Sequence, residues 1–128
     1  MSSQPALAPA KPGPQLSLDQ QRAQWAWRAA GAGVAEDKDY AKLTKSVPTL
    51  IMGSGLLQTM AYLRIKKHDV LFGQLARVLK LGDDPIKKLV EMDPATYRAK
   101  TEAALALLRW LRHFAAVIAK DAKEETHG

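Results

Sequence analysis

The side chains that could perform catalysis or bind a metal ion are few and widely spaced in this 128-residue chain. Cysteine is absent, which excludes disulfides and thiolate metal sites. The histidines have no metal-like spacing with one another or with acidic residues; they are His68, His113 and His127. Adjacent carboxylates occur at Glu36-Asp37 and Asp83-Asp84, where loops or helix caps account for them. We therefore expect no catalytic residue, no metal and no cofactor.

The segment Gly53-Ser54-Gly55 precedes an expected helix, a place where backbone N–H groups can bind an anion. A phosphate loop needs a glycine-rich span that ends in Gly-Lys-Ser or Gly-Lys-Thr, and no lysine follows here. A dinucleotide site would also need a preceding strand and a parallel sheet, which the composition does not supply. We expect these glycines to permit close packing or a bend, with Ser54 available as a helix cap.

Positive charge is the remaining chemical feature. The chain holds 19 Lys and Arg against 13 Asp and Glu, a formal net charge of +6, which favours nucleic acid, an acidic protein or an anionic membrane surface as partner. Between Tyr40 and His68 there is no acidic residue, and the cations there are Lys42, Lys45, Arg64, Lys66 and Lys67. We predict that these five contact the phosphates of a nucleic acid without reading sequence. Further candidates on the last expected helix are Arg109 and Arg112.

The elements that must position these residues all show helical periodicity, and no segment alternates with period two over the length of a strand. Ser17 and Gln20 form a capping-box pattern at the start of a first helix, which Gly31 and Gly33 are expected to end. A second helix begins near Asp37 or Asp39, and Pro48 ends or kinks it. Basic residues at the C-terminal end of a helix complement the helix dipole, and this alone could explain Lys66 and Lys67. It explains Lys42 and Lys45 less well, because they lie on the second helix.

Four further helices are expected, over residues 49–67, 68–84, 84–92 and 93–120. The first of them is expected to be mostly buried, and the last two begin with an acidic cap followed by proline, at Asp84-Pro85 and Asp93-Pro94. The apolar face of the last helix is expected at Ala104, Leu107, Leu108, Leu111, Phe114 and Ile118. The pattern predicts an all-α fold, a compact single-domain bundle of about five to six helices.

The chain divides into three parts by composition. Residues 1–15 are rich in Pro and Ala and predict a disordered tail, residues 16–121 predict the helical bundle, and residues 122–128 predict a frayed polar C-terminus. The uncharged run from Ser46 to Leu63 contains Pro, Gly, Ser, Thr and Gln, whereas a membrane span needs about 20 predominantly apolar residues. We expect no membrane segment, and with no secretion signal visible the expected location is cytoplasmic.

Two segments resemble a known family. They are YAKLTKSVPTLIMGSGLLQTMAYLRIKK, residues 40–67, and ALALLRWLRHFA, residues 104–115. In this order they resemble the small helical subunit of the type III-B CRISPR (Cmr) RNA-guided effector complex. That family ends in a helix of the Leu-x-Trp-Leu-x-x-Phe type, represented here by Leu108, Trp110, Leu111 and Phe114. The resemblance covers Leu16 to Lys120 and leaves the Pro/Ala-rich tail outside.

The resemblance implies a compact α-helical domain without catalytic activity of its own, because RNA cleavage and nucleotide-signalling or DNA-cleaving activities belong to other subunits of such complexes. Several copies stack along the effector and line the groove where target RNA pairs with guide RNA. The implied partners are guide and target RNA, the backbone and other subunits of the CRISPR effector complex, and neighbouring copies of the chain. The implied role is in antiviral defence.

The residues alone leave a second interpretation open, a generic basic helical interaction module that docks on an acidic protein partner. A helical enzyme would need a buried polar constellation, and none is visible in the sequence. A helix-turn-helix DNA reader would need a short helix pair with an exposed recognition helix, which the pattern also lacks. Co-purification separates the two leading interpretations: a small RNA with several proteins indicates the effector subunit, and a single protein partner indicates the module.

Overall fold

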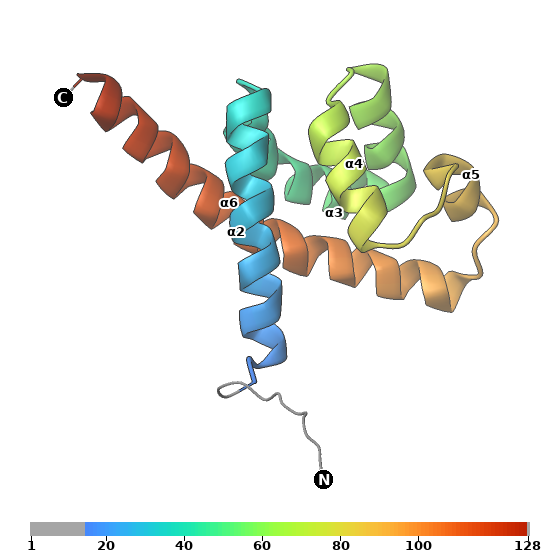
Figure 1. The fold of residues 1–128 in the computed structure, drawn as a ribbon. Helices are drawn as coiled ribbons and strands as arrows, with labels where there is room; N and C mark the ends of the chain where they lie inside the picture. Colours follow the sequence, from blue (N-terminus) through green and yellow to red (C-terminus); the bar gives the residue numbers. More distant parts are fainter. Residues whose placement is uncertain (1–14, 128) are drawn as a thin grey trace, which may run out of the picture.

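The computed structural model describes residues 15–127, and all regular structure within that range is helical. Five helices follow one another, namely α2 (Leu18–Glu36), α3 (Tyr40–Ile65), α4 (Asp69–Val78), α5 (Pro85–Val90) and α6 (Pro94–His127). Helix α2 crosses α6, and α3, α4 and α5 gather to one side of that crossing (Figure 1). The predicted all-α fold, a compact bundle of about five to six helices, is confirmed. The predicted tail at residues 1–15 lies, apart from its last residue, outside the described residues.

Helix α2 begins as predicted and ends later than predicted. The Ser17 hydroxyl accepts from the Gln20 backbone N–H at 3.1 Å, and the Gln20 side chain accepts from the Ser17 backbone N–H at 2.9 Å, which completes a capping box. The helix then continues through Gly31 and Gly33 to Glu36, so the prediction that these glycines end it was wrong. Gly33 is buried and lies against the ring of Tyr40. Glycine is therefore needed here because a larger side chain would not fit, and not because the helix ends.

Helix α3 also runs past its predicted end. It does not stop at Pro48, although proline inside a helix removes a hydrogen bond and costs about 3 kcal/mol or more. Burial of the neighbouring side chains of Val47 and Ile51 offsets that cost. The backbone instead leaves helical geometry at Gly55, where φ is 88° and ψ is 162°, a region open essentially only to glycine. Gly55 thus divides α3 into a first arm, residues 40–54, and a second arm, residues 56–65.

Residues 49–67, which form the end of the first arm and the second arm, were predicted to be mostly buried. This was wrong for the side of the helix that faces solvent. Leu56, Met60 and Leu63 are buried, but Met52 is 78% exposed and Ile65 is 75% exposed. Helical periodicity explains the difference, because a helix that packs on one side must present its other side to solvent, whatever its composition.

Helices α5 and α6 begin at their predicted caps. The Asp84 carboxylate accepts from the Lys87 backbone N–H at 3.3 Å before the short helix α5. The Asp93 carboxylate accepts from the backbone N–H and the hydroxyl of Thr96 at 3.0 and 2.7 Å, and these bonds lower its pKa. Helix α6 then continues to His127, past the predicted frayed end at residues 122–128. Its final turns extend beyond α2, away from the rest of the bundle (Figure 1).

The core lies where α6 packs against α2 and α3. Of the six residues predicted for the apolar face of α6, the four from Ala104 to Leu111 are buried, whereas Phe114 and Ile118 are half-buried at its margin. Phe114 packs edge-on against the half-exposed Trp27 of α2, with 5.2 Å between ring centroids. Tyr40 contributes the largest buried ring.

A hydrogen-bonded chain through the core joins three helices. The Tyr40 hydroxyl on α3 donates to Gln74 Oε1 on α4 at 2.6 Å, and Gln74 Nε2 donates to the backbone carbonyl of Ala29 on α2 at 2.9 Å. The polar atoms in this series of hydrogen bonds have partners, so their burial costs little free energy. Gln74 therefore fixes the spacing of α2 and α4.

The buried Tyr40 phenol predicts a loss of stability in alkali. Burial raises its pKa well above the ordinary 10.0, and the bond to Gln74 offsets only part of that increase. Above about pH 10 the unfolded chain loses this proton while the folded chain keeps it, so the free energy of unfolding falls by about 1.4 kcal/mol per pH unit. We expect denaturant unfolding between about pH 9 and about pH 11 to show this slope, and Tyr40→Phe to lack that share of it. Equal slopes in both proteins would contradict the prediction.

Candidate functional site

The two arms of α3 lie side by side, which brings its two ends together. An open groove of about 570 Å³ is lined by one residue of the second arm and five of the first: Tyr62, Ser46, Thr49, Leu50, Gly53 and Ser54. At one end of the arms, Asp37 just before α3 approaches His68 just after it, with 3.8 Å between Oδ2 and Nδ1. The chain therefore enters and leaves α3 at the same end of the bundle.

This return groups the cations predicted to contact RNA. Two lie within the first turns of the first arm and three at the end of the second, and we call them the α3-end cluster: Lys42, Lys45, Arg64, Lys66 and Lys67. All five are exposed. Among the described residues the only ion pair within 4 Å is His68–Asp37, so no carboxylate neutralises a member of the cluster by direct contact. Because the chain enters and leaves α3 at the same end of the bundle, we infer that the cations from both ends of this 26-residue helix lie toward that end.

The end of the second arm is held in a defined turn. The His68 backbone N–H donates to the Leu63 carbonyl at 2.9 Å and the Lys67 N–H to the Arg64 carbonyl at 3.1 Å, the pair of bonds of a Schellman motif. Lys67 adopts a left-handed conformation with φ of 61°, a position where glycine is the usual residue. A lysine in that conformation places a cation where the helix would ordinarily end in an uncharged residue.

Arg64 has a second support, from α4. Its guanidinium lies 5.6 Å from the centroid of the Phe72 ring, within the range of a cation–π contact. This contact keeps the guanidinium over the α3–α4 junction, exposed and charged. Arg64 thus has a side-chain contact with α4 in addition to its place at the end of α3.

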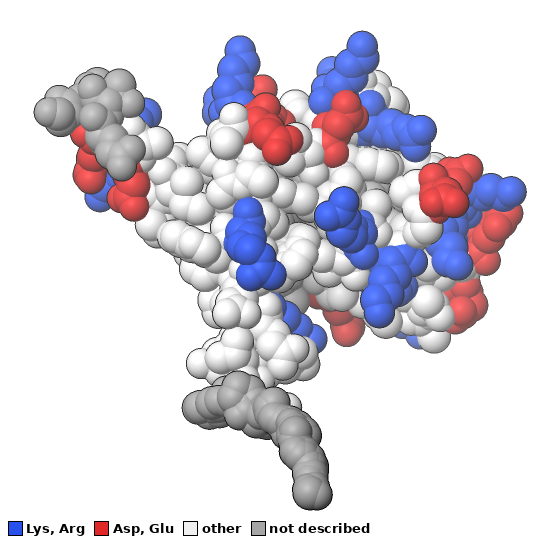
Figure 2. Space-filling model, viewed as in Figure 1, with Lys and Arg blue, Asp and Glu red and all other residues white. Residues whose placement is uncertain are grey.

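Acidic residues border the cluster. The acid-free interval of the sequence is flanked by Asp37 and Asp39 on one side and by Asp69 on the other, and the return of α3 brings both flanks to the same end. On the face drawn in Figure 2, blue and red side chains alternate where α2 ends and where α4 begins. The positive surface around the α3-end cluster is therefore smaller than the length of the acid-free interval suggests.

Arg109 and Arg112 do not join the α3-end cluster by any contact that the structure records. Both are exposed on α6, on the side of that helix away from the residues that pack against α2 and α3. Their neighbours in the helix, Leu108 and Leu111, are fully buried. The two arginines thus form a separate positive site on the outer surface of α6.

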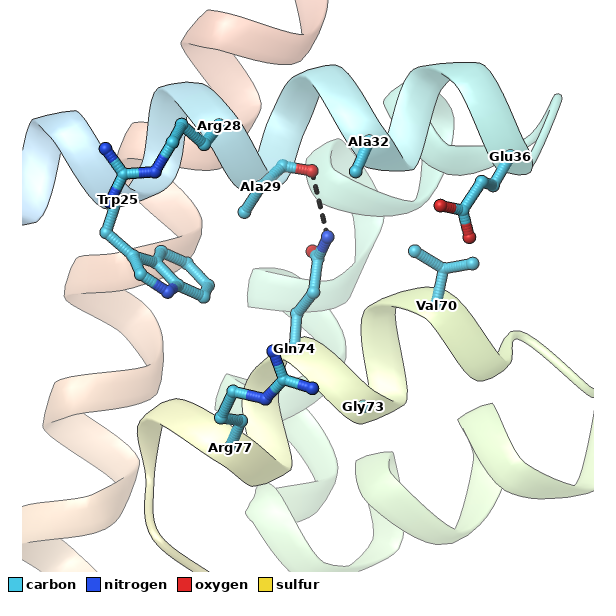
Figure 3. A pocket seen from close by; sticks show the side chains of 9 residues that line it. All are labelled: Trp25, Arg28, Ala29, Ala32, Glu36, Val70, Gly73, Gln74 and Arg77. Carbon is cyan, nitrogen blue, oxygen red and sulfur yellow. Dashed lines mark hydrogen bonds between the residues drawn. The ribbon is translucent and has the colours of Figure 1, made fainter.

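One cavity was not predicted from the sequence. It holds about 400 Å³ between α2 and α4, and its lining includes Trp25, Arg28 and Arg77 (Figure 3). The lining residues of each helix follow one another at spacings of one, three and four, which places them on one face of that helix. This spacing was the only sign of the cavity in the sequence. Which stripes face each other depends on the packing of α2 against α4, and this was not visible in the sequence.

Neither a metal-binding cluster nor a membrane-spanning helix is present among residues 15–127. The described part of the chain brings no three His, Asp or Glu side chains together in an arrangement that could hold a metal ion. Among residues 15–127, no helix combines the length and the apolar character that a bilayer crossing requires. His113 is exposed and His68 faces Asp37.

Comparison with known proteins places these helices in a family context. Residues 18–118 match the family model described as "CRISPR-associated protein (Cas_Cmr5)". A relative from Thermotoga maritima named "CRISPR system Cmr subunit Cmr5" is 31% identical over 101 residues, which cover 73% of this chain and 78% of that protein. The matched range begins at the first residue of α2 and ends within α6, so it includes the core, both arms of α3 and the cavity between α2 and α4.

Proposed function

The chain belongs to the Cas_Cmr5 family of CRISPR-associated proteins, and from this premise we propose that it is a non-catalytic RNA-binding scaffold subunit of a type III-B CRISPR (Cmr) RNA-targeting effector complex. In this proposal several copies stack along the groove between guide and target RNA, beside the backbone and other subunits. The complex acts in antiviral defence in the cytoplasm. The family supports the place in a Cmr complex, and the charged surface supports the contact with RNA.

One observation carries the RNA contact, namely the exposure of the α3-end cluster. Its members lack a carboxylate partner among the described residues and come from both arms of α3. Exposed cations that no internal anion neutralises can replace the counterions of an RNA backbone, and the released counterions drive binding. Arg109 and Arg112 offer a second such contact on α6.

Contacts with neighbouring proteins have their own support. Leu16, Trp27 and Val117 are 39%, 48% and 47% exposed, and Leu16 and Trp27 line an apolar depression where α2 crosses α6. Half-exposed aromatic residues of this kind are enriched where proteins bind one another. This surface suits a neighbouring copy or a backbone subunit. Its residues belong to other parts of the sequence than the α3-end cluster.

The test is reversal of all five charges of the α3-end cluster to glutamate. We expect the dissociation constant for a single-stranded RNA at low salt to rise at least about tenfold, because each lost phosphate contact removes the release of about 0.7 counterion. The logarithmic salt dependence of binding should become shallower. Fluorescence anisotropy of labelled RNA at several salt concentrations measures both quantities.

A matched control reverses five other exposed cations: Lys87, Lys88, Arg98, Lys120 and Lys123. It makes the same change in net charge on α5 and α6, so long-range electrostatics alone would weaken both variants equally. Unchanged circular dichroism and melting temperature show that both variants fold. Unaltered RNA affinity in the α3-end variant refutes the assignment of these residues, and loss of co-purifying protein with unaltered RNA affinity indicates the acidic-partner module instead.

A further inference from the structure

The cavity between α2 and α4 has the features of a small binding site. Facing stripes on the two helices enclose about 400 Å³ that opens to solvent, within the range of ligand pockets. Figure 3 shows the ring of Trp25 and the guanidinium of Arg77 at the gap between the helices, with the Arg28 side chain above Trp25 on α2. In Figure 2 the cations over the middle of this face stand among uncharged side chains.

The two arginines carry unopposed charge. Neither Arg28 nor Arg77 has a carboxylate within 4 Å among the described residues, and both are exposed. They lie on different helices, so a ligand that contacts both must bridge α2 and α4. Trp25 is half-buried, with part of its ring packed on the core and part available to the cavity. Two guanidiniums beside an indole are the groups that bind a phosphate and a base of a nucleotide.

A hydrogen-bonded Gln74 and small residues line the floor of the cavity. Gln74 spans it, bonded to the Ala29 carbonyl on one side and to the Tyr40 hydroxyl on the other. Gly73 lies in the middle of α4, where glycine is less favourable than alanine. A Cβ at Gly73 would meet no atom within 4 Å, so internal packing does not require the glycine. Its absence of a side chain keeps the cavity open.

We propose that this cavity binds one unpaired nucleotide of a single-stranded RNA, with the base stacked on the Trp25 indole and the phosphate paired with Arg28 and Arg77. The inference rests on the proposed function, because it requires that the chain meets RNA. It adds a second contact, separate from the α3-end cluster, that recognises an unstacked base in addition to the backbone. Sequence-tolerant stacking of this kind is common among proteins that bind single strands.

Glu36 sets the orientation of the bound nucleotide. Its carboxylate lies near Val70, at the end of the cavity away from Trp25 (Figure 3). A phosphate at that end would be repelled, so the phosphate of a bound nucleotide is expected beside Arg28 and Arg77 instead.

The proposal is tested with a substitution that fills the cavity and leaves the core unchanged. Gly73→Leu adds an exposed side chain to a helix in open space and should raise the dissociation constant for a single-stranded RNA about tenfold. Trp25→Leu, which keeps an apolar side chain but no aromatic face, should have a similar effect. Anisotropy titrations with the full chain measure both, and thermal unfolding reports whether Trp25→Leu remains folded.

A control matches Gly73→Leu. Ala35→Leu adds an exposed leucine to α2 outside the cavity lining and should bind RNA as the unmodified chain does. Gly73→Leu with unchanged affinity overturns the inference even if reversal of the α3-end cluster abolishes binding, and the proposed function then stands. An unmodified chain that binds no RNA at low salt overturns both.

Discussion

Replacement of Gly33 by alanine is expected to lower the free energy of unfolding by about 3 kcal/mol, at the upper end of the cost of overpacking a core. A Cβ at this position would overlap three atoms of the Tyr40 ring. The ring cannot move aside, because Tyr40 is fully buried and its hydroxyl donates to Gln74 at 2.6 Å. Relief of the overlap must therefore separate α2 from α3 or break the chain of bonds that joins α2, α3 and α4.

The neighbouring glycine provides the control. A Cβ at Gly31 would meet no atom within 4 Å, and the residue lies in the interior of the same helix. Gly31→Ala should therefore stabilise the protein by about 0.5–1 kcal/mol through reduced backbone entropy of the unfolded chain. Denaturant unfolding of the two variants measures the difference, about 4 kcal/mol in total by these estimates. Equal stability of the two variants would refute the packing of Gly33 against Tyr40.

Replacement of Gly55 by alanine is expected to cost about 2–3 kcal/mol and to weaken RNA binding as well. At φ of 88° and ψ of 162° an alanine is strained, and its Cβ would lie 3.3 Å from the Tyr97 hydroxyl oxygen. That oxygen accepts from the Leu57 backbone N–H at 2.9 Å, a donor that the break in α3 leaves without a helical partner. Relaxation toward continuous helix would swing the second arm away from the first and disperse the α3-end cluster.

Two further variants isolate the cause. Gly53→Ala lies in open space in the first arm and should be neutral or stabilising by about 0.5 kcal/mol, with RNA affinity unchanged. Tyr97→Phe keeps the ring and leaves Leu57 N–H unpaired, which should cost about 1–3 kcal/mol. Thermal unfolding with RNA titration separates stability from binding. A Gly55→Ala protein with full stability and full affinity would show that the break in α3 has no role in either.

The glycines show why local rules described this chain incompletely. Gly31, Gly33, Gly53 and Gly55 look alike in a sequence, and the helix-ending role of the first two followed from their common use after helices. In the fold only Gly33 has a neighbour that excludes a side chain, and only Gly55 has a backbone conformation that excludes one. The first reason involves the Tyr40 ring of another helix, and the second is a backbone turn beside which the Tyr97 hydroxyl of α6 accepts from Leu57 N–H.

Capping signals were more reliable because both partners are close in sequence. Ser17 with Gln20, Asp84 with Lys87 and Asp93 with Thr96 form their bonds three residues apart. The apolar face of α6 was likewise visible from its period, except at its margin, where Phe114 and Ile118 remain half-buried. The prediction failed on the exposed side of α3, since an uncharged surface gives a helix no polar face to recognise.

The sequence by itself determined the all-α class, the starts of three helices, the lack of cysteine chemistry and the presence of a long acid-free interval with five cations. These follow from residue type and short-range spacing, where propensity, capping and periodicity act. Only the tertiary structure decided that Gly55 turns α3 back on itself, that both ends of that interval meet beside acidic residues, and that Trp25, Arg28 and Arg77 line one cavity. Those features depend on contacts between residues far apart in the chain, and such contacts are set by the packing of whole helices.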